Sequence, residues 1–441
     1  MRPSFKTSLV KLLAIGVLFY GTYGFANWFT AQRDHIPEIV FAWERNIPFW
    51  SWSIVPYWSL NFFYALAFFL CSSVRQQNRY IAQLLSAQAI AVACFLLFPL
   101  KFSWAKPPTN GLAGSLFDSL AAFDQPYNQA PSLHIMLALI VGRFYWYRLP
   151  VNWRIVWVSW LGLIALSVMT TWQHHFIDIP TGLLAGALVL WALPWKENEI
   201  VASPLSGRIC PLKRHYLWVG FYALMACAFV VLSAFGGAWL YFLWIAMACL
   251  LLTAAYMRLG AAVMQKQQNG RHTLAANLLL LPYRLGAYLN MRIWLRGHAL
   301  SVEVVRGKIH IGSIRNVNNF DLVLDVCAEL PANRLPEYYV SFPMLDMVTP
   351  SANELAQSAD ILHELIEKKK GPVLTCCALG YGRSAAVVLT WLLRHGGFVD
   401  LKHVLMLLKK AQPKMVFYPE MGDAILSAAK LNRNSNGLFD K

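Results

Sequence analysis

The stretch Thr375-Cys376-Cys377-Ala378-Leu379-Gly380-Tyr381-Gly382-Arg383-Ser384 decides the fold of the C-terminal part of this chain. The apolar residues 372–374 before it predict a buried strand, and the apolar residues 385–393 after it predict a buried helix. A loop between a strand and a helix N-terminus turns backbone N–H groups toward one point, where they favour an anion. The stretch therefore predicts an α/β domain with an anion-binding cradle.

Three features of this loop carry chemistry. A thiol at Cys377 in such a field favours its thiolate form, which is a nucleophile. Arg383 follows on the same loop and can bind two oxygens of one anion. Gly380 and Gly382 permit the φ values that turn N–H groups inward. Cysteine followed at this distance by arginine is common by chance, but the added glycine, serine, strand and helix make the pattern specific.

The loop resembles the active-site signature of the cysteine-based dual-specificity and tyrosine phosphatases. The resemblance implies that Cys377 is the nucleophile, Arg383 the phosphate clamp and Ser384 the hydroxyl that helps the thiolate leave. It also implies a general acid about thirty residues upstream, where Asp346 stands. The family usually has histidine before the nucleophile, and this chain has Cys376 there. The cradle expected to bind the substrate phosphate comprises Ala378, Leu379, Gly380, Tyr381 and Gly382.

The composition is that of a membrane protein. Of the 441 residues 57% are hydrophobic and only 14% charged, whereas a soluble domain has about a quarter charged residues. Apolar segments predict about eight transmembrane helices, of which the first is read as an uncleaved helix although it also suits a signal peptide. The segments are 8–30, 50–72, 80–100, 132–149, 154–172, 178–195, 215–236 and 238–257.

Lysine and arginine residues predict the orientation. They gather at the N-terminus and in alternate loops, so these parts are expected to be cytoplasmic. With eight spans the C-terminal domain also returns to the cytoplasm, which agrees with a catalytic thiolate in a reducing compartment. The basic residues used are Arg2, Lys6, Arg75, Arg79, Arg143, Arg148, Arg154, Lys196, Arg208, Lys213 and Arg214.

A second group of polar residues stands at the ends of predicted spans on the outer side. His174 and Asp178 are four residues apart and share a face on a helical turn, so the carboxylate can orient the imidazole as a nucleophile or base. His134, from another span, could protonate a leaving oxygen. Lys101 and Lys106 add positive charge for a phosphate. The alternative is a set of interfacial histidines without chemical function.

Residues 80–195 resemble the PAP2 (type 2 phosphatidic acid phosphatase) superfamily. Lys101 and Lys106-Pro107 stand at its first motif, Pro131-Ser132-Leu133-His134 matches P-S-x-H, and His174 with Asp178 matches H-x3-D. The resemblance implies His174 as nucleophile, Asp178 as its orienting group and His134 as general acid, with Lys101, Lys106 and Ser132 at the substrate. Lys106 replaces the usual arginine of the first motif, and Val168 replaces the usual arginine of the third motif. The pattern leans toward the branch of phospho-headgroup transferases, so transfer remains an alternative to hydrolysis.

Residues 258–300 are rich in basic and apolar residues and contain no acidic ones. They predict one or two amphipathic helices on an anionic leaflet, and a nucleic-acid interface is the less favoured alternative. From residue 301 the pattern predicts a hairpin turning at Arg306-Gly307, strands at 322–326 and 338–342, and a helix opened by the capping box of Ser351 and Glu354. Helices at 400–411 and 419–431 and a loose tail from 432 complete the domain.

Together these features predict an all-α polytopic membrane domain with a PAP2-like six-helix core, followed by an α/β cysteine-phosphatase domain. The predicted parts are 1–200, 201–257 with two further spans, the basic linker 258–300, and 301–441. We expect a multi-pass protein of the bacterial inner membrane that hydrolyses phosphomonoesters of lipids or proteins without cofactor, metal or nucleic acid. In the alternatives the PAP2 half is a transferase, or one half is an inactive anchor or sensor.

Overall fold

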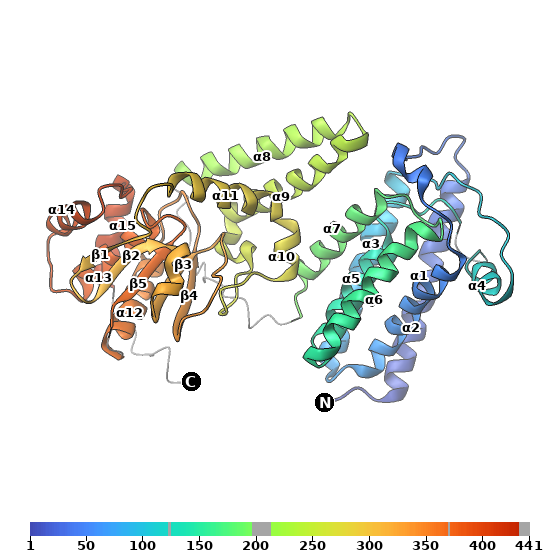
Figure 1. Cartoon of the computed structure of the whole chain (residues 1–441), viewed down its shortest axis with the longest axis horizontal. Helices are drawn as coiled ribbons and strands as arrows, with labels where there is room; N and C mark the ends of the chain where they lie inside the picture. Colours follow the sequence, from blue (N-terminus) through green and yellow to red (C-terminus); the bar gives the residue numbers. More distant parts are fainter. Residues whose placement is uncertain (122–124, 196–212, 369–370, 432–441) are drawn as a thin grey trace. The chain divides into compact units, whose positions relative to one another are not determined.

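The computed structural model describes residues 1–121, 125–195, 213–368 and 371–431. The chain forms two compact units, Met1–Trp195 and Lys196–Lys441 (Figure 1). Each unit is described by itself. The predicted loose tail from residue 432, and the basic residues Lys196 and Arg208, lie outside the described residues.

The first unit is helical throughout. Each apolar segment predicted within it forms a helix, because uninterrupted apolar runs of this length favour helical over extended structure. One helix, α4, was not predicted and lies in the connection between the third and fourth segments. The helices are α1 (Phe5–Ala31), α2 (Ile54–Leu70), α3 (Val74–Leu97), α4 (Gly111–Ala121), α5 (Leu133–Trp146), α6 (Val151–Thr170) and α7 (Asp178–Ala192), with short 3-10 turns at Ala42–Asn46 and Ser51–Ser53.

Six helices in the described part of the chain are long and apolar enough to cross a membrane, rather than the eight predicted. The two exceptions are α5 and α7, with 14 and 15 residues. About 20 residues are needed to span the hydrocarbon layer. The six segments are Phe5–Ala31, Ser51–Leu70, Val74–Leu97, Val151–Thr170, Arg214–Ser233 and Gly237–Met264.

The short helices α5 and α7 pack closely against each other through glycine. A Cβ atom on Gly182 would lie 2.7 Å from the Ser132 carbonyl oxygen, and one on Gly186 would lie 3.1 Å from the Met136 Cα. Small residues four apart allow two helix backbones to approach in this way. The approach brings the N-terminus of α7, with Asp178, to the N-terminus of α5, where the Ser132 N–H donates to the Asp178 carbonyl oxygen at 3.1 Å.

The second unit begins with two apolar helices, α8 (Lys213–Ser233) and α9 (Phe242–Ala254). They are joined through Gly236 and Gly237, both with positive φ. After α9 the chain continues through a π turn at Ala255–Leu259 and a 3-10 turn at Gly260–Met264 into α10 (Leu274–Leu279) and α11 (Leu281–Trp294).

A five-stranded sheet forms the centre of the C-terminal domain. Its order is β1-β2-β5-β3-β4, and only β1 and β2 are antiparallel. The predicted hairpin is confirmed, with Gly307 at a φ of +68° in its turn. The predicted strands are confirmed as well. The bounds are β1 (Ser301–Val305), β2 (Ile309–Ser313), β3 (Leu322–Cys327), β4 (Tyr338–Met344) and β5 (Val373–Cys377).

Helices cover both faces of this sheet (Figure 1). One face packs against α12 (Ala352–Lys368), α13 (Arg383–Arg394), α14 (Leu401–Ala411) and α15 (Pro419–Lys430). The predicted capping box opens α12, since the Glu354 N–H donates to Ser351 Oγ and the Ser351 N–H donates to Glu354 Oε2.

The other face of the sheet packs against α11 through Met291 and Leu295. Residues predicted to form a linker on the membrane surface therefore contribute one layer of the domain. Lys266, counted in the sequence among the surface-lying basic residues, is fully buried beside the sheet instead. The sequence pattern missed this because a basic residue with a buried carboxylate partner looks like any other in a basic stretch.

Candidate active sites

The predicted cradle connects β5 to α13. Cys377 is the last residue of β5, and the Gly380 N–H donates to its Sγ at 3.2 Å. Ser384 Oγ lies 3.4 Å from the same sulfur. Gly380 has a φ of +84°, and a Cβ there would lie 2.7 Å from the backbone of Gly312. Glycine is therefore required at this turn, which directs an N–H group at the sulfur.

Arg383 starts α13 and is held by an acidic residue that the sequence analysis missed. Its Nη1 and Nη2 donate to Glu329 Oε2 and Oε1 at 2.8 and 2.6 Å. Nη1 also donates to the Met344 carbonyl oxygen, at 2.9 Å. Glu329 follows β3 at the carboxyl edge of the parallel strands, where the cradle also lies. An acidic residue just after an apolar strand was the signal that could have identified it.

Asp346 lies on the loop after β4, with its Oδ1 3.3 Å from Arg383 Nε. The surrounding protein disfavours its charged form and raises the pKa of this carboxyl, against the opposing effect of the Arg383 guanidinium. Its side chain is still 43% exposed, so it can reach a ligand. Burial would also raise the pKa of Glu329, but Arg383 outweighs burial and holds that pKa low. The pKa values of the two carboxyls beside one guanidinium are thus shifted in opposite directions.

A pocket of about 100 Å³ lies at this loop. Cys377, Arg383 and Asp346 all contribute to it, so the structure brings together the nucleophile, clamp and acid that the sequence predicted. Tyr418 forms one wall of this pocket. Arg214 of α8 stacks on Tyr418, with the guanidinium carbon of Arg214 3.5 Å from the centroid of the tyrosine ring. The remaining lining residues are Met347, Val348, Ala378, Leu379, Tyr381, Gly382, Val416 and Met421.

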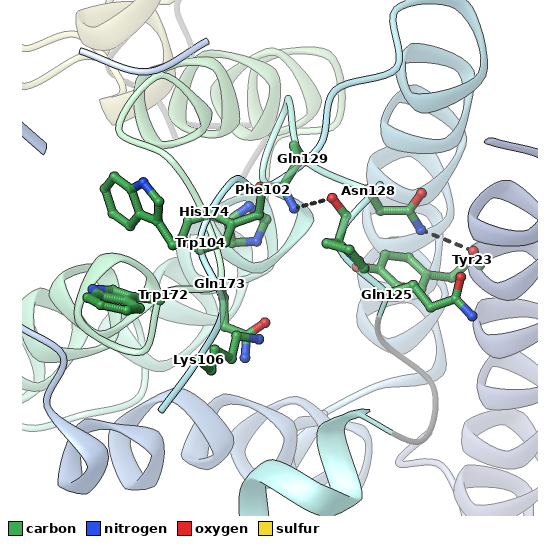
Figure 2. A pocket seen from close by; sticks show the side chains of 11 residues that line it. Tyr23, Phe102, Trp104, Lys106, Gln125, Asn128, Gln129, Trp172, Gln173 and His174 are labelled. Atoms are coloured by element: carbon green, nitrogen blue, oxygen red, sulfur yellow. Dashed lines mark hydrogen bonds between the residues drawn. The ribbon is translucent and has the colours of Figure 1, made fainter. Parts of the chain in front are cut away.

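The first unit holds a second pocket, of about 210 Å³ (Figure 2). His174 and Lys106 line it together. Three buried amide side chains line it as well, and each keeps one polar atom without a hydrogen-bond partner among the described residues: Asn128 Oδ1, Gln129 Oε1 and Gln173 Nε2. The aromatic walls are Tyr23, Phe102, Trp104 and Trp172.

The predicted histidine–aspartate pair is formed in this pocket. His174 Nδ1 lies 3.1 Å from Asp178 Oδ2, and both side chains are buried. His134 stacks on Tyr57 with ring centroids 3.9 Å apart. Its Nε2 has no hydrogen-bond partner within the described ranges. The close packing of α5 on α7 brings together the two helix N-termini, where His134 and Asp178 stand.

Two of the predicted substrate-binding residues have other partners. Lys101 Nζ forms an ion pair with Glu38 at 3.1 Å and does not line the pocket. Ser132 is fully buried and caps α5 by accepting the Ile135 N–H. Of the basic residues predicted for phosphate at this site, the structure brings Lys106 to His174 and leaves Lys101 outside.

A second imidazole–carboxylate pair, which the sequence analysis did not identify, lies beside the first. His175 Nδ1 is 3.0 Å from Glu44 Oε2, and both groups are buried. On its other side His175 Nε2 is 3.1 Å from Ser103 Oγ, in the loop that continues to Lys106. Burial would raise the pKa of Glu44, but hydrogen bonds from His175 and two backbone N–H groups lower it. Glu44 is far away in sequence, so no local pattern signals the pair.

Among the residues described, no cluster of three or more histidine, cysteine, aspartate or glutamate side chains has the arrangement of a metal site. One pocket offers a thiol, a guanidinium and a carboxyl. The other offers the His174 imidazole and the Lys106 ammonium group, with the Asp178 carboxylate 3.1 Å from His174 Nδ1.

Two family models match the chain. The "PAP2 superfamily" model matches residues 45–193, and the model for "Dual specificity phosphatase, catalytic domain" matches residues 307–423. No curated protein matches the sequence.

Solved structures similar to this chain include Tk-PTP in its active form, at 20% identity, covering 29% of this chain and 96% of that one with a TM-score of 0.26. Human DUSP28 is 18% identical, with 30% and 93% covered and a TM-score of 0.27. PTPMT1 in complex with PI(5)P is 12% identical, with 30% and 96% covered and a TM-score of 0.26.

Proposed function

Since this chain is a phosphoric monoester hydrolase with a PAP2 superfamily domain and a dual-specificity phosphatase catalytic domain, we propose that it is a membrane-bound enzyme with two separate active sites. One site uses Cys377 and the other His174 as nucleophile. The observation that carries the proposal is that a cation lines each pocket together with the candidate nucleophile, Arg383 with Cys377 and Lys106 with His174. In addition, Asp178 contacts the His174 imidazole.

At the cysteine site the Cys377 thiolate attacks phosphorus while the ester P–O bond breaks. Asp346, whose protonated form is favoured by its raised pKa, gives its proton to the leaving oxygen. Arg383 and the cradle N–H groups stabilise the charge on the other phosphate oxygens. Water then attacks the phosphocysteine, Asp346 accepts a proton from that water, and Ser384 assists the departing sulfur through its 3.4 Å contact.

A phosphomonoester on a membrane lipid is the substrate class that we favour for this site. Arg214 of the apolar helix α8 stacks on a pocket wall, which ties the pocket to a candidate membrane span. On α11 the exposed side chains Leu281, Leu285, Leu289 and Ile293 recur every four residues and form an apolar stripe suited to an interface. The cradle carries no lysine, which disfavours polyphosphorylated inositol headgroups. A phosphorylated protein side chain is the second candidate.

At the second site the imidazole of His174, oriented by Asp178, attacks phosphorus, and His134 protonates the leaving oxygen. Lys106 and the unpartnered amide atoms are suited to a polar phosphorylated headgroup. If an alcohol replaces water in the second step, the same site acts as a headgroup transferase. The absence of arginine from the motifs around Lys106 and Val168 is the basis of the alternative, in which this half is an inactive anchor or sensor.

We propose that the protein spans the bacterial inner membrane, with its N-terminus and cysteine domain in the cytoplasm and the histidine site on the opposite side. Six helices with sufficient length and apolar character support membrane insertion. The basic residues of alternate loops support the orientation.

Two variants separate the sites. Purified Cys377→Ser and His174→Ala proteins would be assayed on phosphatidate, phosphatidylglycerophosphate and p-nitrophenyl phosphate. We expect each variant to lose the hydrolysis of a different substrate. If His174→Ala changes no activity while Cys377→Ser removes all turnover, the two-site proposal fails and the anchor alternative holds. Phosphate transfer only in the presence of an added alcohol would identify a transferase.

A further inference from the structure

The loop that carries Glu329 is held by a segment outside the matched catalytic domain. We call residues 265–284 the strap; they follow the candidate span Gly237–Met264 and precede the matched residues 307–423. Four successive carbonyl oxygens of the loop, from Cys327 to Leu330, accept hydrogen bonds from strap side chains. The donors are Lys266 to Cys327 and Leu330, His272 to Ala328, and Arg284 to Glu329.

Lys266 is the centre of this arrangement. Its ammonium group is fully buried and donates to Asp325 Oδ2 at 2.6 Å, to the Cys327 carbonyl at 2.5 Å and to the Leu330 carbonyl at 2.9 Å. A lysine has three N–H donors, and all three are used. Such a saturated buried charge fixes the direction of the groups around it, because any shift leaves a donor unpaired.

His272 and Arg284 hold the next two carbonyls. His272 Nε2 donates to the Ala328 carbonyl at 2.8 Å, and Arg284 Nε donates to the Glu329 carbonyl at 3.1 Å. Asn277 links them, since its Nδ2 donates to the His272 carbonyl and its Oδ1 accepts from Arg284. Gly270 lets the strap lie directly on the loop, because a Cβ there would lie 2.8 Å from that of Ala332.

Through Glu329, the position of this loop also fixes the position of Arg383. Glu329 binds both terminal nitrogens of Arg383, so the direction of the Glu329 backbone determines where the guanidinium plane lies. The segment just before the strap also reaches the acid, since Tyr256 Oη donates to the Asp346 carbonyl oxygen at 3.1 Å. Residues outside the matched domain thus contact both the loop that carries Glu329 and the loop that carries Asp346.

We infer that the strap is a functional part of the cysteine site: Lys266, His272 and Arg284 are positioning residues that act through Glu329 on Arg383. The strap lies outside the matched catalytic domain, so the phosphate clamp is complete only in a chain that retains the strap. This inference rests on the proposed role of Arg383 as phosphate clamp.

The test measures anion binding at Cys377 in the full chain in detergent micelles. Iodoacetate is an anion and iodoacetamide is neutral, so the ratio of their rates of Cys377 alkylation reports how well the clamp holds an anion. In His272→Leu and Arg284→Met we expect this ratio to fall about tenfold, because neither new side chain can donate to the loop and a small misplacement of a binding group costs this much. Glu329→Gln should give the same fall, and the double variants should add nothing further.

Arg271→Met is the matched control, because Arg271 lies in the strap with an exposed side chain and the same charge is removed. Its ratio should equal that of the unmodified chain. A Tm recorded for every variant separates positioning from unfolding. An unchanged ratio in both strap variants, or a fall that only follows the loss of Tm, overturns the inference. If Cys377→Ser retains full phosphatase activity, the proposed function fails, whereas the alkylation ratio still decides the role of the strap.

Discussion

The two candidate sites are assembled in different ways. At the cysteine site the nucleophile, the cradle and the arginine lie within one short loop between β5 and α13, and partners from two neighbouring strand ends complete it. At the histidine site the groups come from the ends of separate helices, and a glycine contact between α5 and α7 brings those ends together. A site built on one loop can be recognised from one sequence motif, whereas a site built by helix packing depends on residues that no local sequence pattern identifies.

The largest effect on activity is expected from a change of the Arg383 guanidinium at the cysteine site. Arg383→Lys should lower kcat/KM on p-nitrophenyl phosphate by about 10²–10³, because lysine cannot bind two phosphate oxygens or both oxygens of Glu329. Steady-state kinetics and vanadate inhibition would measure the loss. Activity of the His174 site in the same preparation serves as the control, and a loss below threefold would contradict the assigned clamp.

A smaller loss of activity is expected at the histidine site. Glu44→Gln should raise KM for a substrate of the His174 site about tenfold and leave kcat less affected, because Glu44 acts through His175 and Ser103 on the loop that carries Lys106. Asp34→Asn is the matched control, since Asp34 is an exposed carboxylate outside this network and should leave KM unchanged. An equal effect of both substitutions would contradict the role of the buried pair.

The pH dependence of kcat/KM at the cysteine site is a further difference from the histidine site. The Asp346 carboxyl must be protonated to act as acid, so kcat/KM should fall as pH rises through its raised pKa. Asp346→Asn should abolish this alkaline fall and lower the rate most for esters with poor leaving groups. A pH–rate profile on phenyl phosphate and p-nitrophenyl phosphate measures both effects. An alkaline limb that persists in the variant would assign it to another group.

The smallest effect concerns stability. Burial, and then the nearby Arg284 charge, lower the pKa of His272 from 6.5 to about 3. Between these values the unfolded chain binds a proton that the folded chain does not, so unfolding free energy falls with decreasing pH by up to about 1.4 kcal/mol per unit. His272→Asn should flatten this dependence in denaturant titrations from pH 6.5 to 4. The same slope in both proteins would contradict the buried neutral state.

Much of the C-terminal fold could be predicted because its signals are local. The hairpin at Gly307, the capping box of Ser351 and the strand–cradle–helix around Cys377 each depend on neighbouring residues. Glu329 and Lys266 were not identified, because their roles come from partners that the sheet brings together. The membrane-segment prediction recovered the helices but overcounted those of full spanning length, since the apolar runs at α5 and α7 continue past the helix ends.

In the helical unit the sequence yielded the pair of His174 and Asp178 because four residues on one turn share a face. Glu44 could not be paired with His175 in advance, since nothing in the sequence fixes which helix ends meet. For the same reason Lys101 was expected at the substrate and pairs with Glu38 instead.

The most direct test of the two-site account is to map the covalent intermediate. The enzyme would be quenched rapidly during turnover of a lipid phosphomonoester, digested under conditions that preserve phosphocysteine and phosphohistidine, and examined by mass spectrometry. The account predicts a phosphate on Cys377 that disappears in Cys377→Ser and, independently, one on His174 that disappears in His174→Ala. Phosphate on any other residue, or neither adduct in an enzyme that turns over, would contradict it.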